Sequence, residues 1–164
     1  MPSDSQSAPP RVSLAPMNQA IYEAWRQRSV AEYAAEHVKA GNWEAGEALQ
    51  RAGAQFDELL PDGLATTGQS LWSIRDADGR HVGILWVGPR PRTQKALFIW
   101  DIAIEPEARG RGLGQAALEA LHGWAREEGY ERVGLHVFGS NDVARRLYLR
   151  MGYVETDVQM EMRL

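Results

Sequence analysis

The spacing of apolar side chains changes several times along the chain, and each change marks a predicted element. Residues 154–164 alternate apolar or β-branched with polar side chains, which is typical of a half-buried antiparallel strand. The run LFIWDIAI at 97–104 has the length of one buried strand, and Asp101 is its one charge. Shorter strand patterns lie at residues 11–17, 71–75, 81–87 and 132–138. The second and third of these flank the turn sequence DADG and predict a hairpin.

Helical spacing of apolar residues predicts four helices between these strands. The first begins at Asn18 as its N-cap and extends to Ala40, and the second covers residues 43–60. The third follows a glycine-rich turn and ends at Gly129, and the fourth begins after Asn141. No repeat or second domain boundary interrupts this order. The sequence therefore predicts one mixed α/β domain over residues 11–164, preceded by a disordered tail at residues 1–10.

Composition excludes several classes of function. A net charge of −4 gives no electrostatic support for a general nucleic-acid role. No apolar run approaches membrane-spanning length, and the N-terminus lacks the pattern of a signal peptide. The absence of cysteine excludes disulfides, thiolate metal sites and a cysteine nucleophile. We therefore expect a cytoplasmic protein without a metal centre and without nucleic-acid or membrane partners.

A glycine-rich basic turn, RGRGLG at 109–114, follows the apolar run after the acidic link EPEA. It opens directly into the third predicted helix, where unpaired backbone N–H groups and the helix dipole favour an anion. Glycines let the backbone approach a phosphate without a Cβ clash, and the two arginines add charge-assisted bonds. The turn is thus a candidate phosphate site.

Three interpretations of this turn compete at this point. A P-loop would need Lys and Ser or Thr after the glycines, and neither follows. A dinucleotide fingerprint is half satisfied, since Gly112, Gly114 and Ala117 match G-x-G-x-x-A. However, five residues separate the strand from the glycines, and the next strand does not end in the acidic residue that would hold a ribose. The third interpretation is a plain strand-to-helix connection with arginines for solubility.

Two motifs in sequence resemble the GNAT superfamily of N-acetyltransferases. R-x-x-G-x-G at 109–114 is similar to the family's acetyl-CoA motif, and N-x-x-A-x-x-x-Y-x-x-x-G-Y at 141–153 is similar to its closing segment. The order of the preceding helices and hairpin also fits. The chain is therefore identified as a bacterial, single-domain member. The resemblance implies a mostly antiparallel central sheet flanked by helices and splayed at the acetyl-CoA site.

The resemblance also implies how acetyl-CoA, the co-substrate, is held. Backbone N–H groups of the turn would bind its pyrophosphate, at Arg109, Gly110, Arg111, Gly112, Leu113, Gly114 and Gln115. Backbone atoms of Ile102, Ala103 and Ile104 would pair with pantetheine, and the N–H near Ile102 would bind the thioester oxygen. A bulge would have to splay this strand from its neighbour. Asn141 would contact the cofactor in addition to its role as an N-cap.

Catalytic roles follow from the same resemblance, with competing interpretations from the residues alone. Tyr148 matches the general acid that protonates the leaving thiolate, although an aromatic residue on a helix stripe is usually core. Asp101 is the catalytic base candidate, because burial would raise its pKa. Its side chain has the opposite parity to Ile102, however, so a structural role is an equal alternative. Glu105, His136 and a water relay are further candidates for the base.

The acceptor is predicted only as a primary amine on a small molecule, peptide or protein. Acidic residues outnumber basic ones in the first two helices, which would suit a cationic amine but also a solvated face. Without cysteine, direct transfer in a ternary complex is expected. The alternatives are a non-catalytic acyl-CoA-binding module and a nucleotide-binding oxidoreductase. Membership of the family also implies a homodimer as one option.

Overall fold

The computed structural model describes residues 8–164, so most of the predicted N-terminal tail lies outside the described residues. The strands are β1 (Ser13–Pro16), β2 (Ser70–Arg75), β3 (His81–Pro89), β4 (Ala96–Ile104) and β5 (Arg132–Leu135). The helices are α1 (Gln19–Lys39), α2 (Ala45–Leu59), α3 (Leu113–Glu127) and α4 (Asp142–Arg150), with short 3-10 turns at Gly63–Ala65 and Pro106–Ala108. Within this part of the chain no helix combines the length and hydropathy needed to cross a bilayer.

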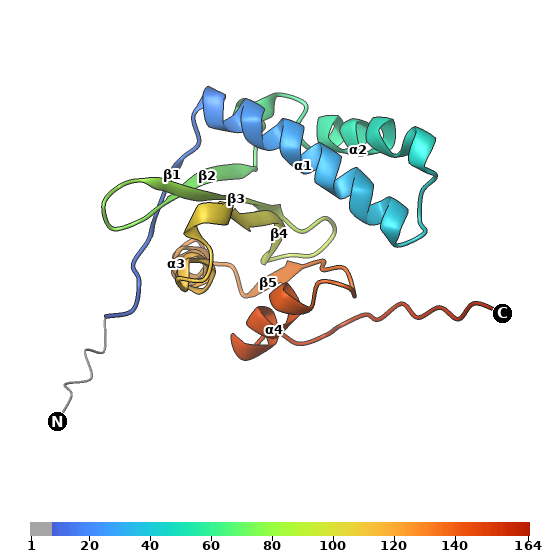
Figure 1. Cartoon of the computed structure of the whole chain (residues 1–164). Helices are drawn as coiled ribbons and strands as arrows, with labels where there is room; N and C mark the ends of the chain where they lie inside the picture. The colour runs from blue at the N-terminus through green and yellow to red at the C-terminus, as the bar shows by residue number, and fades with distance from the viewer. Residues whose placement is uncertain (1–7) are drawn as a thin grey trace.

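The strands form one sheet in the order β1-β2-β3-β4-β5. The first three pairings are antiparallel. In the described chain β4 and β5 form the one parallel pair, because α3 carries the chain back to the end of the sheet at which β4 begins. Helices α1 and α2 lie above the sheet in Figure 1, whereas α3 lies below it. The predicted mixed α/β class, with a mostly antiparallel sheet, is confirmed.

Each face of the sheet has its own apolar core. On the side of α1 and α2, the ring of Trp25 packs 5.9 Å from that of Phe56 and 5.5 Å from that of Trp86. On the side of α3, the aliphatic residues Leu97 and Leu118 are almost completely buried. The two cores hold β3 and β4 between them, so these strands form the rigid centre from which the site is built.

A β-bulge at Trp100 changes the direction of side chains along β4. Trp86 of β3 pairs with Asp101, whereas the next residue, Val87, pairs with Ile99, so Trp100 is the extra residue on β4. Trp100 packs with the α1–α2 core, and Ile99 with the α3 core. The family resemblance implies such a bulge, but no local sequence signal marks its position.

The pairing of β4 with β5 stops early. Its last register pair is Ile99 with Leu135, while β4 continues to Ile104. The two strands therefore separate beyond the bulge, as the splayed sheet predicts. The predicted strand over residues 132–138 is too long, because residues 136–138 have lost the β4 partner that would define them as a strand.

Helix ends follow the sequence closely. Asn18 Oδ1 accepts a hydrogen bond from the Ile21 N–H at 2.9 Å, and Asn141 Oδ1 accepts one from the Ala144 N–H at 3.2 Å. Both predicted N-caps are confirmed. The predicted strand at residues 154–164 is wrong: this described segment forms no strand and is exposed throughout. Alternation alone cannot supply the neighbouring strand that a ladder requires.

Candidate functional site

The separation of β4 from β5 opens a cavity of about 140 Å³, here called the β4–β5 cavity. It is lined by Ile99, Trp100, Asp101, Ile102, Leu135, His136, Val137, Phe138, Asn141 and Tyr148. Four predicted site residues therefore meet here from two parts of the sequence: Asp101, Ile102, Asn141 and Tyr148. Helix α4 supplies Tyr148, and the bulged strand supplies Asp101 and Ile102. The predicted site residues Ala103 and Ile104 continue along β4 beyond the end of its pairing with β5.

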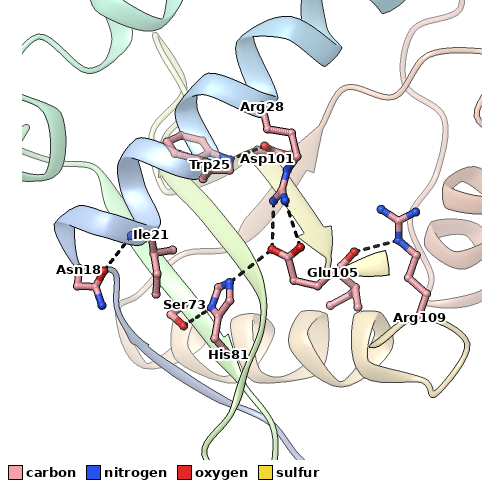
Figure 2. A network of polar contacts seen from close by, with 10 residues as sticks. Asn18, Ile21, Trp25, Arg28, Ser73, His81, Asp101, Glu105 and Arg109 are labelled. Carbon is pink, nitrogen blue, oxygen red and sulfur yellow. Dashed lines mark hydrogen bonds and ion pairs between the residues drawn. The ribbon is translucent and has the colours of Figure 1, made fainter. Parts of the chain in front are cut away.

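Asp101 is held from the side of α1 (Figure 2). Its Oδ2 accepts a hydrogen bond from Trp25 Nε1 at 2.8 Å and another from Ser29 Oγ at 3.0 Å. Burial raises the pKa of Asp101, and the two hydrogen bonds oppose that rise by favouring the carboxylate. Ile102 packs with the opposite core, which confirms the parity expected from the sequence. Asp101 nevertheless lines the β4–β5 cavity.

Tyr148 faces the same cavity from α4. Burial raises the pKa of its hydroxyl to about 12, and the negative charge of Asp101 adds to the rise. Within residues 8–164 no hydrogen bond of this hydroxyl is found, whereas the hydroxyl of neighbouring Tyr153 lies 2.7 Å from His122 Nε2. Tyr148 thus offers a protonated hydroxyl that is free to bond a ligand.

Glu105, the second carboxylate that could act as the base, forms an ion pair with Arg28. Both terminal nitrogens of Arg28 donate to its oxygens at 3.1 Å, and His81 Nε2 lies 3.5 Å away (Figure 2). Arg28 lowers the pKa of Glu105, which makes it a weaker base. Glu105 lines a different cavity of about 310 Å³ between α1 and β3, not the β4–β5 cavity. The geometry therefore argues against this carboxylate as the base.

The outer wall of the β4–β5 cavity is aromatic. The Phe138 ring lies 5.2 Å from those of His136 and His37, and His37 stacks at 3.9 Å on Trp43. Burial and the nearby charge of His136 lower the pKa of His37, which favours its neutral form. Phe138 and His136 line the cavity, whereas His37 and Trp43 pack behind Phe138 and are not lining residues. Phe138 was not among the residues expected at the site, and its contact with His37 could not be expected, because nothing in the local sequence brings α1 next to the loop after β5.

Trp100 adds an unusual feature to the cavity. Its indole Nε1 is buried and has no hydrogen-bond acceptor among the described residues. A buried donor without a partner typically costs about 1–3 kcal/mol. Three tryptophans of strands β2, β3 and β4 differ in their surroundings. Trp100 lines the cavity, Trp86 is core, and Trp72 packs 4.7 Å from Trp124 on the α3 side.

The glycine turn has the conformation that phosphate binding needs. Gly110 and Gly112 both have φ of +75°, a left-handed conformation that glycine adopts without strain. Gly112 is the N-cap of α3 and supplies no side-chain cap. Within residues 8–164, no acceptor is found for the backbone N–H groups from Gly110 to Gln115. These donors fit an anion such as a pyrophosphate.

The two arginines of the turn differ in their roles. Arg109 donates its Nε–H to the carbonyl of Ile104 at 2.9 Å, so it fixes the end of β4 to the turn. Arg111 is more than half exposed and lies 3.9 Å from the Asp76 carboxylate. A Cβ placed on Gly114 would lie 3.6 Å from Leu147 of α4, so the turn also borders the helix that carries Tyr148. Turn, β4 edge and α4 thus form one continuous surface.

Comparisons with known proteins agree with this arrangement. Residues 19–153 match the model of the acetyltransferase (GNAT) family. The N-acetyltransferases YdgE and YycN of Bacillus subtilis are 35% and 37% identical to this chain. Each match covers 93% of this chain and 98% or 99% of the relative. The crystal structure of YycN superposes with a TM-score of 0.88 at 36% identity, covering 93% of this chain and 98% of that one.

Proposed function

The chain belongs to the acetyltransferase (GNAT) family, and we propose that it transfers the acetyl group of acetyl-CoA directly to a primary amine. One observation carries this proposal. The β4 strand continues past its last pair with β5 at Ile99 and Leu135, and the gap so formed contains both a carboxylate and a tyrosine hydroxyl. An extended thioester arm along the open edge of β4 would meet both groups.

The donor would lie across the turn and the strand. Its pyrophosphate would accept hydrogen bonds from the backbone N–H groups of residues 109–115, supported by the unpaired state of those donors from Gly110 onward. Its pantetheine would pair with the backbone of Ile102, Ala103 and Ile104, as a peptide adds to a sheet edge. The N–H near Ile102 would polarise the thioester carbonyl, a contribution of about 3 kcal/mol in comparable oxyanion sites. Asn141 lines the same cavity and would contact the cofactor.

The chemistry requires a proton acceptor for the ammonium group and a proton donor for the leaving thiolate. Asp101 would take a proton from the ammonium group of the acceptor, because a raised pKa makes a carboxylate a better base at neutral pH. The free amine then attacks the carbonyl carbon, so that a C–N bond forms and the C–S bond breaks. Tyr148 would donate its proton to the departing thiolate and recover one, through water, from the second proton that the new amide nitrogen loses, while Asp101 returns its proton to solvent. Its pKa of about 12 keeps it protonated until that step.

The acceptor would enter past Phe138, a lining residue against which the ring of His37 packs from the end of α1. Aromatic faces attract ammonium groups, and the buried carboxylate of Asp101 adds negative charge at the floor of the cavity. The small volume of the cavity suits an amine at the end of an unbranched chain. These features support a primary amine as the acceptor group, on a small molecule, a peptide or a protein.

The test combines binding with turnover. Acetyl-CoA is expected to raise the melting temperature, and thiol release is expected with at least one member of a panel of amines, peptides and aminoglycosides. Absence of any thermal shift at saturating acetyl-CoA would overturn the proposal. A shift without thiol release from any amine would instead support a non-catalytic acyl-CoA-binding module. A response to NAD(P) and not to CoA would support an oxidoreductase.

A further inference from the structure

The side chain of Arg90 lies over the sheet at the place where β4 and β5 are still paired. Arg90 begins the loop that joins β3 to β4, residues 90–95, and this loop runs close to β5 (Figure 1). Its guanidinium carbon lies 5.9 Å from the centre of the Phe98 ring. A Cβ added to Gly134, the β5 partner of Phe98, would lie 3.4 Å from Arg90 Nη1. A glycine at this position therefore leaves room for the guanidinium to lie on the sheet.

This position is next to the β4–β5 cavity. The Phe98 ring packs edge-on against Trp100, with ring centres 4.7 Å apart, and Trp100 lines the cavity. His136, two residues after Gly134, lines it as well. Two residues of strand span about 7 Å, so the guanidinium of Arg90 stands roughly one such step outside the cavity wall.

The charges around this position are not balanced. Among residues 8–164 no ion pair of Arg90 is found, whereas Lys95 of the same loop pairs with Glu131 at 2.6 Å. Arg132, exposed at the start of β5, has no ion pair in this part of the chain either and adds positive charge. The acidic residue that lines the cavity is Asp101. The site therefore presents a carboxylate inside the cavity and an unpaired guanidinium just outside it.

We propose that the acceptor is a small amino carboxylate, whose carboxylate binds Arg90 while its ammonium group lies at Asp101; this inference rests on the proposed acetyl transfer to an amine. A guanidinium binds a carboxylate through two parallel N–H donors, which gives both charge and direction. Phe98 and Asp101 lie three positions apart on β4, about 10 Å at roughly 3.3 Å per residue. Hydrogen bonds of about 2.9 Å at the two ends of the acceptor take up more than half of that span, which leaves room for about two to four methylene groups. The rings of Phe98 and Trp100 would pack against this apolar chain.

Calorimetric titration of the full chain in the presence of saturating CoA tests the proposal without acetyl transfer. The probes are 4-aminobutanoate and 4-amino-1-butanol, which share the amine and the carbon skeleton and differ in the carboxylate. We expect 4-aminobutanoate to bind about tenfold more tightly, the usual scale for a hydrogen bond to a charged group. Arg90→Gln should remove this preference and leave the affinity for the alcohol unchanged. Arg92→Gln, the matched control, removes the same charge two residues further along the loop and should keep the preference.

Thiol release from acetyl-CoA with the same two probes separates this inference from the proposed function. Tighter binding of 4-aminobutanoate without thiol release would support the carboxylate site and count against acetyl transfer. Thiol release at equal kcat/KM with both probes, together with equal affinities, would support acetyl transfer and overturn the carboxylate site. Failure of 4-aminobutanoate to bind would overturn the proposal, and so would a preference that survives in Arg90→Gln. Melting of each variant establishes that it is folded.

Discussion

Trp25 donates its indole N–H to Asp101 Oδ2 across 2.8 Å and so fixes a carboxylate of β4 from the helix that packs above it. The carboxylate remains at the floor of the cavity that Tyr148 enters from α4. Burial raises the pKa of both groups, because the interior disfavours the charged carboxylate of Asp101 and the charged phenolate of Tyr148. The site is thus a pair of titratable groups held by two different layers of the fold.

Replacing Asp101 by Asn tests this carboxylate as the base. Asn retains an oxygen that can accept from Trp25 and Ser29, so the geometry should survive. We expect kcat/KM to fall by about 100-fold, the lower range for loss of a general base. The acid limb of the natural protein's pH–rate profile should also disappear. An Asn variant with full activity would reduce Asp101 to a structural role.

The free energy of unfolding of the natural protein, compared with that of Asp101→Asn, should depend on pH. Because the folded state raises the pKa of Asp101 above its ordinary 3.8, the folded protein holds this proton more tightly than the unfolded chain. The free energy of unfolding of the natural protein, relative to Asp101→Asn, should therefore fall as pH rises from below 3.8 through the raised pKa. Urea denaturation of both proteins across this range measures the difference. A difference that does not change with pH would contradict the prediction.

Replacing Tyr148 by Phe tests the general acid. Turnover should fall by about 100-fold while acetyl-CoA affinity changes by less than about twofold, because only the leaving thiolate loses its proton donor. With a pKa of about 12, Tyr148 should produce no alkaline limb in the rate at pH values well below 12. Stopped-flow thiol release and calorimetric titration with acetyl-CoA measure the two quantities.

Tyr153→Phe is the matched control, since this tyrosine lies just beyond the end of α4 and its hydroxyl contacts His122, and it is not among the residues that line the cavity. Loss of that hydrogen bond should cost about 1 kcal/mol of stability and leave turnover unchanged. Equal losses of turnover in both variants would show that the hydroxyl of Tyr148 has no special role.

Replacing Gly112 by Ala tests the phosphate turn. The residue has φ of +75°, and an added Cβ would lie 3.2 Å from Pro10 Cγ, so the variant is strained in two ways. A left-handed conformation costs a non-glycine residue about 1–2 kcal/mol. Shift of the turn should weaken acetyl-CoA binding by about tenfold or more. Gly123→Ala, in the same helix and with open space around the added Cβ, should stabilise the protein by about 0.5–1 kcal/mol without changing affinity.

Replacing Glu105 by Gln separates structure from catalysis. Because Arg28 lowers the pKa of Glu105 below its ordinary 4.5, the ion pair stabilises the protein above that pH and is lost as pH falls through the lowered pKa. Arg28 is 42% exposed, so the loss at neutral pH should be about 1 kcal/mol. Turnover should stay within about twofold of the natural protein. Glu107→Gln, at an exposed position in the following turn, should change neither quantity.

The positions of several candidate-site residues could be predicted from the sequence, because the determinants of these positions are local, whereas the roles of these residues rest on the family resemblance. The turn at residues 109–114 needs only glycines and a following helix, and Asn141 needs only to precede one. Tyr148 is placed by its spacing from Asn141 within α4, and the parity of Asp101 against Ile102 follows from strand geometry alone. Each of these depends on side chains and dihedral angles a few residues apart.

The remaining features depend on which segments become neighbours. The bulge at Trp100 and the end of β5 at Leu135 depend on how neighbouring strands pair. The sequence of one strand does not determine its register against the next strand. Glu105 lies outside the β4–β5 cavity, and its carboxylate forms an ion pair with Arg28 of α1, a contact that depends on how α1 packs. The alternating tail shows the limit most directly: its pattern encodes a strand, but only an available sheet edge can complete the hydrogen bonds that make it one.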